Sequence, residues 1–314
     1  MKIIYMGTPE FAQPALQKIY DLGHEIPLVV TRPDRARNRN KVTPTPVKEL
    51  ALSLGIPVEQ PDRLVGNTEF IKQLKELAPD MIVVASYGRI LPPEILEIPP
   101  YGCINIHGSL LPKYRGASPV QTSILMGEEE TGVTLMHMAE GMDTGDMIAK
   151  RAVPVEKKTY GELLDELGHV GADLLADTLD DLFAGTAERT PQNGEEATYA
   201  SMITKKDGEI DFSRSPKAIE CQIRAFQPWP SAYTYWKGDM MKVLKAEARE
   251  DLTTDKADGT VISADKKGIA VAAGGKQLII TQLQMPGKKA MEVAAFLLGN
   301  KMEPGMLLGE KPEQ

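Results

Sequence analysis

The sequence predicts an α/β protein in which a Rossmann-like domain with a mostly parallel sheet precedes a small β domain. From residue 1 to about residue 150, short apolar runs alternate with segments of helical periodicity, the arrangement of βαβ units. Residues 81–86 are almost entirely apolar, as expected for a strand buried on both faces of a sheet. After residue 198 the pattern changes to short strands separated by glycine turns, which suggests a small OB-like barrel.

The first domain begins with a strand over residues 3–6. Gly7 makes the turn that follows, Thr8 can cap the next helix, and Pro9 suits its first turn. Further strands are expected at 26–31, 81–86, 103–107 and 133–138, with an edge strand at 147–152. Helical periodicity predicts helices at 47–54, 70–77, 119–126 and 160–183.

A polar segment over residues 185–198 contains Pro191-Gln192-Asn193-Gly194, which is typical of a linker. Beyond it, strands are expected at 231–236, 241–248, 259–263, 268–272 and 277–284, and a helix at 291–298. We therefore expect domains at 1–188 and 207–314, joined by a linker at 189–206.

Composition excludes several function classes. The net charge of −8 argues against a protein that coats nucleic acid nonspecifically. No apolar run approaches ~18 residues, and the start lacks the features of a signal peptide, so we expect a cytoplasmic protein without a membrane span. The two cysteines, Cys103 and Cys221, fit neither a metal-ligand spacing nor a disulfide framework, so no metal is expected.

One basic segment interrupts the acidic first domain. Between Arg32 and Lys48 the only acidic residue is Asp34, whereas the basic residues of this segment are Arg32, Arg35, Arg37, Arg39, Lys41 and Lys48. Charge runs are usually solvated loops, but the length and single sign of this one favour a phosphate-rich partner.

The strand at 103–107 brings two polar side chains to one place. Because side chains alternate along a strand, Asn105 and His107 share a face, with their Cα atoms roughly 7 Å apart. They precede the carboxyl end of a predicted parallel strand, where ligands of α/β sheets bind, so we favour a functional role over structural hydrogen bonding. Cys103 shares their face, but four residues of strand place it ~13 Å from His107, too far for a nucleophile–base pair.

Asp143 lies between Gly141 and Gly145 after a predicted strand. Alone, Asp-Thr-Gly is ordinary turn chemistry. Together with Asn105 and His107, Asp143 makes a plausible triad for acyl or amide chemistry. Residues 110–117 have no regular period, so this loop could either plug the core or form the wall of a flat apolar ligand site. Neither a dinucleotide-binding fingerprint nor a P-loop occurs.

Several motifs resemble those of the 10-formyltetrahydrofolate-dependent formyltransferases. They are Gly7-Thr8-Pro9-Glu10-Phe11, Cys103-Ile104-Asn105-Ile106-His107-Gly108-Ser109-Leu110-Leu111-Pro112, Tyr114-Arg115-Gly116-Ala117, and Gly141-Met142-Asp143-Thr144-Gly145-Asp146-Met147. Three further segments and the C-terminal barrel are similar to the members that act on tRNA: Thr43-Pro44-Thr45-Pro46-Val47-Lys48, Arg224-Ala225-Phe226-Gln227-Pro228-Trp229-Pro230, and Pro286-Gly287-Lys288-Lys289-Ala290-Met291. The resemblance covers nearly the whole chain.

This resemblance implies transfer of the formyl group of 10-formyltetrahydrofolate to the amino group of methionyl-initiator tRNA. It implies that Asn105, His107 and Asp143 are catalytic. It also implies a folate site formed by Ser109, Leu110, Leu111 and Pro112, with the pterin near residues 84–88. The tRNA would be bound by Arg35, Arg37, Arg39, Lys41, Lys205 and Lys206. We expect a monomer.

Two alternatives stay open. A formyltransferase acting on an amino-sugar nucleotide would share the triad and the folate loop but would not need the basic segment. A nonenzymatic RNA-binding protein on an α/β scaffold is disfavoured by the overall acidity and by the buried Asn105/His107 pair.

Overall fold

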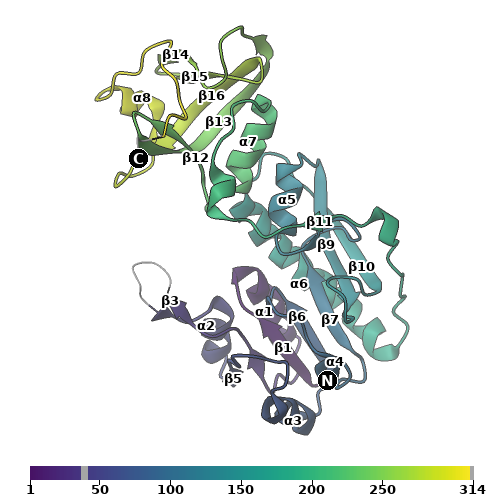
Figure 1. Ribbon diagram of the computed structural model, residues 1–314. Coiled ribbons are helices and arrows are strands. Elements are labelled where there is room, and N and C mark those ends of the chain that lie inside the picture. The colour runs from purple at the N-terminus through teal and green to yellow at the C-terminus, as the bar shows by residue number, and fades with distance from the viewer. Residues whose placement is uncertain (37–41, 312–314) are drawn as a thin grey trace. The chain divides into compact units, whose positions relative to one another are not determined.

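The computed structural model describes residues 1–36 and 42–311, which form two compact units (Figure 1). The first unit comprises Met1–Pro119, Glu130–Pro154 and Leu163–Ser201. The second comprises Val120–Glu129, Val155–Glu162 and Met202–Gln314. Two short segments that precede residue 163 are therefore part of the second unit, and the chain from Leu163 to Ser201 is part of the first.

A seven-stranded sheet forms the centre of the first unit, in the order β10-β9-β7-β6-β1-β2-β5. The five strands from β7 to β5 are parallel. At one side β9 pairs antiparallel with β7, and β10 pairs antiparallel with β9. The expected mostly parallel sheet, with an edge strand near residues 147–152, is therefore confirmed. The strands are β1 (Ile3–Gly7), β2 (Val29–Val30), β5 (Val58–Glu59), β6 (Met81–Ala85), β7 (Cys103–His107), β9 (Glu130–His137) and β10 (Met147–Pro154).

Two short two-stranded ladders and a set of helices complete this unit's backbone structure. Short strands β3 (Arg35–Ala36) and β4 (Val42–Thr43) pair with each other, and β8 (Arg115–Gly116) pairs with β11 (Tyr199–Ala200). The helices are η1 (Glu10–Ala12), α1 (Gln13–Asp21), α2 (Pro46–Ser53), α3 (Thr68–Leu77), α4 (Pro93–Leu96), α6 (Tyr160–Ala184) and η3 (Gly194–Glu196). Of these, α2, α3 and α6 lie within two residues of their predicted bounds.

The two faces of the sheet are covered by different helices. One face carries Ile82 and Val84, which belong to an apolar cluster with Phe70 and Leu74 of α3. The other face carries Ile106, which lies against α6. A Cβ atom on Gly171 of α6 would stand 2.7 Å from the Ile106 side chain, so glycine permits this close helix–sheet approach.

The second unit contains a separate antiparallel sheet in the order β12-β13-β16-β15-β14, with β17 paired to β16. Its strands are β12 (Ala232–Trp236), β13 (Asp239–Thr253), β14 (Val261–Asp265), β15 (Gly268–Ala273), β16 (Lys276–Gln284) and β17 (Met291–Glu292). Its helices are α5 (Pro119–Leu125), η4 (Lys205–Gly208), α7 (Pro216–Ala225) and α8 (Val293–Leu297). All five predicted strands of this region are present.

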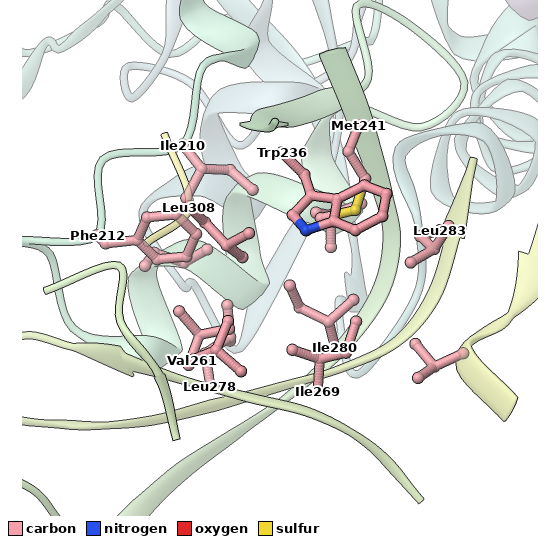
Figure 2. Packing of buried hydrophobic residues seen from close by; sticks show 14 of the residues in the cluster. Ile210, Phe212, Trp236, Met241, Val261, Ile269, Leu278, Ile280, Leu283 and Leu308 are labelled. Atoms are coloured by element: carbon pink, nitrogen blue, oxygen red, sulfur yellow. The ribbon is translucent and has the colours of Figure 1, made fainter. Parts of the chain in front are cut away.

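A large apolar cluster packs against the antiparallel sheet of the second unit (Figure 2). Alternate residues of β12 are buried, which is the pattern of a strand with one face on a core. Trp236 at the end of β12 meets Phe296 of α8 edge-to-face, with ring centroids 5.2 Å apart. Figure 2 shows Trp236 beside Met241, with Ile269 and Ile280 below them.

The chain after α8 makes hydrogen bonds with both outer strands of this sheet. On the β14 side, the Val261 amide donates to the Met306 carbonyl (2.8 Å), and the Leu308 amide donates to the Gly259 carbonyl (2.9 Å). On the β12 side, the Gly309 amide donates to the Tyr235 carbonyl (2.9 Å). A segment of five residues thus runs from one sheet edge to the other.

Candidate active site

The carboxyl end of β7 carries Asn105 and His107 on one face of the sheet. Both are nearly enclosed, with 9% and 6% of their surface exposed. Asn105 stands beside Val84 of β6 and Met136 of β9 in the strand register, and His107 stands beside Thr134. The alternation predicted from the sequence is therefore confirmed.

Asp143 reaches this site from the loop between β9 and β10. Its Oδ1 lies 3.7 Å from His107 Nδ1, and its Oδ2 accepts a hydrogen bond of 2.8 Å from the backbone amide of Gly116. The side chain is 17% exposed. Asp143 has a left-handed backbone conformation with φ 53°, which is uncommon for a residue with a Cβ atom. The structure thus brings together the three residues proposed as a triad.

The imidazole of His107 lies between two acceptors. Its Nε2 lies 3.0 Å from the backbone carbonyl oxygen of Tyr114. A carbonyl oxygen can only accept, so this contact requires a proton on Nε2. Nδ1 then faces the Asp143 carboxylate, 3.7 Å away.

Asn105 differs from His107 because its amide is free to bind a ligand. Among the residues that the structure describes, none forms a hydrogen bond with the Asn105 side chain. A nearly enclosed amide without a partner is costly unless a ligand or water supplies one. Asn105 is therefore the donor in this cluster that is ready for a substrate oxygen.

The loop after β7 is fixed by Thr134. The Thr134 hydroxyl donates to the Ser109 carbonyl (2.7 Å) and accepts from the Leu111 amide (3.0 Å), while the Ser109 hydroxyl donates to the Lys113 carbonyl (2.7 Å). Lys150 Nζ donates to the Leu111 carbonyl.

Two of the four residues expected to bind folate turn their side chains inward. Ser109 is fully buried, and Leu111 is 1% exposed and packs with Met136 and Met147. Leu110 and Pro112 are half-buried. A ligand along this loop would therefore meet backbone groups and the side chains of Leu110 and Pro112.

The strand beside β7 also ends at this edge of the sheet. After β6, Ser86 and Gly88 both have positive φ angles, of 44° and 77°, so the backbone turns sharply. Between them Tyr87 is 1% exposed, and its buried hydroxyl has no hydrogen-bond partner among the described residues. Burial raises the pKa of this phenol. Residues 84–88 and the 109–112 loop thus follow adjacent strands.

Two other titratable groups of the β7 region do not belong to the site. Cys103 is buried in the core, and burial raises the pKa of its thiol to about 12, which removes it as a nucleophile at neutral pH. His137 stands opposite Ile104 in the register and so lies on the other face. Burial, together with the charge of Arg189, lowers the pKa of His137 to about 4, so this ring is neutral at pH 7.

The base of the basic segment is held by an ion pair. Lys48 donates to Asp34 and to Gln60, and Gln60 donates to Asp34 in turn (2.8 Å). Partial burial opposes ionisation, but these hydrogen bonds outweigh it and keep the pKa of Asp34 below its usual value. Lys48 therefore has a structural role, holding together the base of this segment.

The predicted tRNA-binding residues fall in three places. Arg35 is exposed on β3, opposite Thr43 of β4. Arg37, Arg39 and Lys41 lie outside the described residues. Lys205 and Lys206 are exposed on η4 of the second unit, where the Thr204 and Asp207 side chains form a capping box.

Sequence reasoning missed several residues that hold the triad. Gly116 and Tyr114 supply the backbone partners of Asp143 and His107. Gln192, which lies in the expected linker, donates to the backbone of the Asp143 loop. A turn-rich sequence gives no sign of such contacts, because they join segments that are distant in the chain.

No group of three or more metal-ligating side chains occurs among residues 1–36 and 42–311. Within the same ranges, no helix is long and apolar enough to cross a membrane.

Comparison with solved structures shows a shared fold. HypX from Aquifex aeolicus in complex with tetrahydrofolic acid superposes with a TM-score of 0.63 and 18% identity over 95% of this chain, which spans 47% of HypX. WlaRD, a sugar 3N-formyl transferase, superposes with a TM-score of 0.67 and 21% identity over 92% of this chain and 99% of its own length.

Comparison with family models and curated proteins is more specific. The model "Formyl transferase" matches residues 1–179, and "Formyl transferase, C-terminal domain" matches residues 202–301. The methionyl-tRNA formyltransferase of Clostridioides difficile (strain 630) is 49% identical over 98% of this chain and 100% of its own length. That of Geotalea daltonii (strain DSM 22248 / JCM 15807 / FRC-32) is 47% identical over 99% of both. The chain therefore belongs to the formyl transferase family.

Proposed function

We propose that this protein transfers the formyl group of 10-formyltetrahydrofolate to the amino group of methionyl-initiator tRNA, the reaction that prepares this tRNA for translation initiation. The observation that carries the proposal is the cluster of Asn105, His107 and Asp143 at the carboxyl end of β7. Near-full-length relatives named methionyl-tRNA formyltransferase support the choice of acceptor.

The reaction forms a bond between the methionyl nitrogen and the formyl carbon and then breaks the bond from that carbon to N10 of the folate. A neutral amine attacks, and negative charge develops on the formyl oxygen. Asn105, whose amide has no partner among the described residues, donates to that oxygen. One such donor is worth about 3–4 kcal/mol of transition-state stabilisation.

His107 and Asp143 provide charge and a route for the proton. The Asp143 carboxylate stabilises a second proton on the His107 ring, at Nδ1. His107 Nε2 donates a hydrogen bond to the Tyr114 carbonyl, and a substrate oxygen that displaced this carbonyl would accept the same hydrogen bond. The amine loses one proton and N10 of the leaving folate gains one. Asp143 Oδ1 and His107 Nδ1 are 3.7 Å apart, which is long for a hydrogen bond, so a bridging water suits proton transfer between these two side chains better than direct contact.

The folate is expected along the loop after β7, with the pterin near residues 84–88. Backbone groups of Ser109 and Leu111, together with the side chains of Leu110 and Pro112, would form the wall of this site. The adjacent strand ends of β6 and β7 support this placement, since ligands of α/β sheets bind where parallel strands end.

The tRNA is expected to bind through basic residues of both units. In the first unit these are Arg35, Arg37, Arg39 and Lys41, and in the second they are Lys205 and Lys206. The ion pair of Asp34 and Lys48 supports this proposal, because it neutralises the only acid of the segment. The remaining cations of the segment are then left for phosphate groups.

We also propose that the second unit is an OB-like barrel that binds the acceptor arm. The segment 305–309 supports closure, because it forms hydrogen bonds with β14 on one side and with β12 on the other. We expect a monomer that works in the cytoplasm, where translation takes place.

The function is tested by incubating the protein with 10-formyltetrahydrofolate and methionyl-tRNA and measuring formylmethionine released from the tRNA by mass spectrometry. A parallel reaction with a dTDP-linked amino sugar tests the alternative suggested by the fold shared with WlaRD. We expect product only with methionyl-tRNA. Formylation of the sugar alone, or of neither acceptor, would overturn the proposal.

A further inference from the structure

We propose that residues 190–200, here called the strap, are a positioning element of the active site, and that Gln192 is its principal positioning residue. The inference rests on the proposed roles of Asp143 and His107. It assigns to the strap a role in catalysis beyond that of a connection between the two units.

Gln192 joins the two loops that surround the triad. Its Nε2 donates to the backbone carbonyls of Asp143 and Gly145, at 2.8 Å each. Its Oε1 accepts a hydrogen bond of 3.0 Å from Nε of Arg115, a residue that is only 6% exposed. One amide therefore ties the Asp143 loop to the segment that follows the folate loop.

The rest of the strap runs along the same two loops. At one end, Thr190 and Met147 exchange both backbone hydrogen bonds, at 2.8 and 2.9 Å. At the other end, β11 pairs in parallel with β8, and the Arg115 amide donates to the Thr198 carbonyl (2.8 Å). The Thr198 hydroxyl accepts from the Tyr114 amide at 2.9 Å.

These contacts fix the groups that touch the triad directly. Tyr114 supplies the carbonyl at His107 Nε2, and Gly116 supplies the amide at Asp143 Oδ2. Both residues are paired with the strap, and the Asp143 loop is bound to Gln192. The strap therefore determines how far the Asp143 carboxylate stands from His107.

The conformation of Asp143 explains why its loop needs this support. Its positive φ is uncommon for a residue with a Cβ atom, although aspartate adopts it more readily than most, and contacts from Gln192 hold the loop in this conformation. A glutamine suits the task because it offers two donors and one acceptor at once. Glutamate at this position would keep the acceptor for Arg115 but would lose both donors to the Asp143 loop.

That difference gives the test, with three variants assayed for formyl transfer to methionyl-tRNA. Gln192→Ala removes all three hydrogen bonds, and Gln192→Glu removes only the two donors. Gln17→Ala serves as the matched control, because Gln17 is a glutamine of α1 outside the strap whose amide donates to Asp21 at the surface. We expect kcat to fall roughly 10- to 100-fold in both Gln192 variants, since a displacement of about 1 Å can cost that much. KM for 10-formyltetrahydrofolate should stay within about twofold, because the hydrogen bonds of Gln192 go to Arg115, Asp143 and Gly145 and not to the folate loop.

Melting temperature separates positioning from simple stability. Gln192→Glu can form an ion pair with Arg115, so we expect it to melt close to wild type while it remains as slow as Gln192→Ala. Wild-type kcat in Gln192→Glu, or a loss of kcat that Gln17→Ala shares, would overturn the inference. This outcome is distinguishable from failure of the proposed function, in which the wild-type protein itself would not formylate methionyl-tRNA. If Gln192→Ala does not fold, kcat and the melting temperature of Gln192→Glu test the inference on their own.

Discussion

Asp143→Asn is the substitution that tests the charge of the triad without changing its shape. An asparagine Oδ1 could still accept from the Gly116 amide, as Asp143 Oδ2 does at 2.8 Å. The Nδ2 group would then stand where Oδ1 now faces His107 Nδ1 at 3.7 Å. A carboxylate that favours a second proton on the ring would be replaced by a donor that disfavours it.

The magnitude follows from the distance. Two unit charges at this separation interact by about 4 kcal/mol at an effective dielectric constant of ~20, which corresponds to roughly 1000-fold in rate. The Asp143 side chain is 17% exposed, so solvent screening reduces this figure. We therefore expect kcat to fall by about 100- to 1000-fold.

The assay is single-turnover formyl transfer, with KM for both substrates measured separately. KM should change little, because the charge acts on the group that assists the transition state rather than on substrate binding. The melting temperature should stay within a few degrees, since the hydrogen bond to Gly116 is preserved. A kcat within tenfold of wild type would refute the role assigned to the Asp143 charge.

Three further predictions concern tRNA binding, pH and stability. Arg39→Ala should raise KM for methionyl-tRNA roughly tenfold at low salt and leave KM for folate unchanged. As a control, Lys72→Ala removes an exposed cation of α3 and should change neither KM. Equal effects of the two substitutions would contradict the role of the basic segment. Because the pKa of Asp34 is lowered in the folded protein, its pairing stabilises the fold above about pH 4 and is lost as the pH falls through that lower value. Melting curves of wild type and Asp34→Asn should therefore differ at pH 7 and converge below about pH 4, and a constant difference would contradict the assignment. Tyr87→Phe removes a buried hydroxyl without a partner, so urea unfolding should show unchanged or higher stability, by up to about 1 kcal/mol, and clear destabilisation would mean that the hydroxyl is paired.

The parts of the fold that could be predicted from sequence are those with a strong local pattern. The apolar run of β6 and the periodicity of α6 gave bounds within a residue of the structure. The strand expected at 26–31 is hydrogen bonded as a strand only over Val29–Val30, because its pairing with β1 and β5 is limited to those residues. Helix α5 was predicted, but its grouping with the second unit depends on contacts that no local pattern encodes.

Some features of the candidate site could likewise be predicted from local sequence pattern, and others could not. Alternation along β7 predicted that Asn105 and His107 share a face, and the glycines around Asp143 indicated a tight loop. Gln192 was missed because Pro191-Gln192-Asn193-Gly194 has the composition of a solvated turn, whereas its side chain forms hydrogen bonds with Arg115, Asp143 and Gly145, which are distant in the chain. The inward side chains of Ser109 and Leu111 were also not foreseeable, since the 109–112 loop has no period that separates core from surface.

The most direct test of the central claim is the rate of formyl transfer by Asn105→Ala. Asn105 has the free donor of the cluster, and its loss should lower kcat with methionyl-tRNA by about 100- to 1000-fold while the dissociation constant for the folate changes little. That result would establish that the carboxyl end of β7 stabilises the transition state of formyl transfer. An Asn105→Ala protein that formylates methionyl-tRNA at the wild-type rate would contradict it.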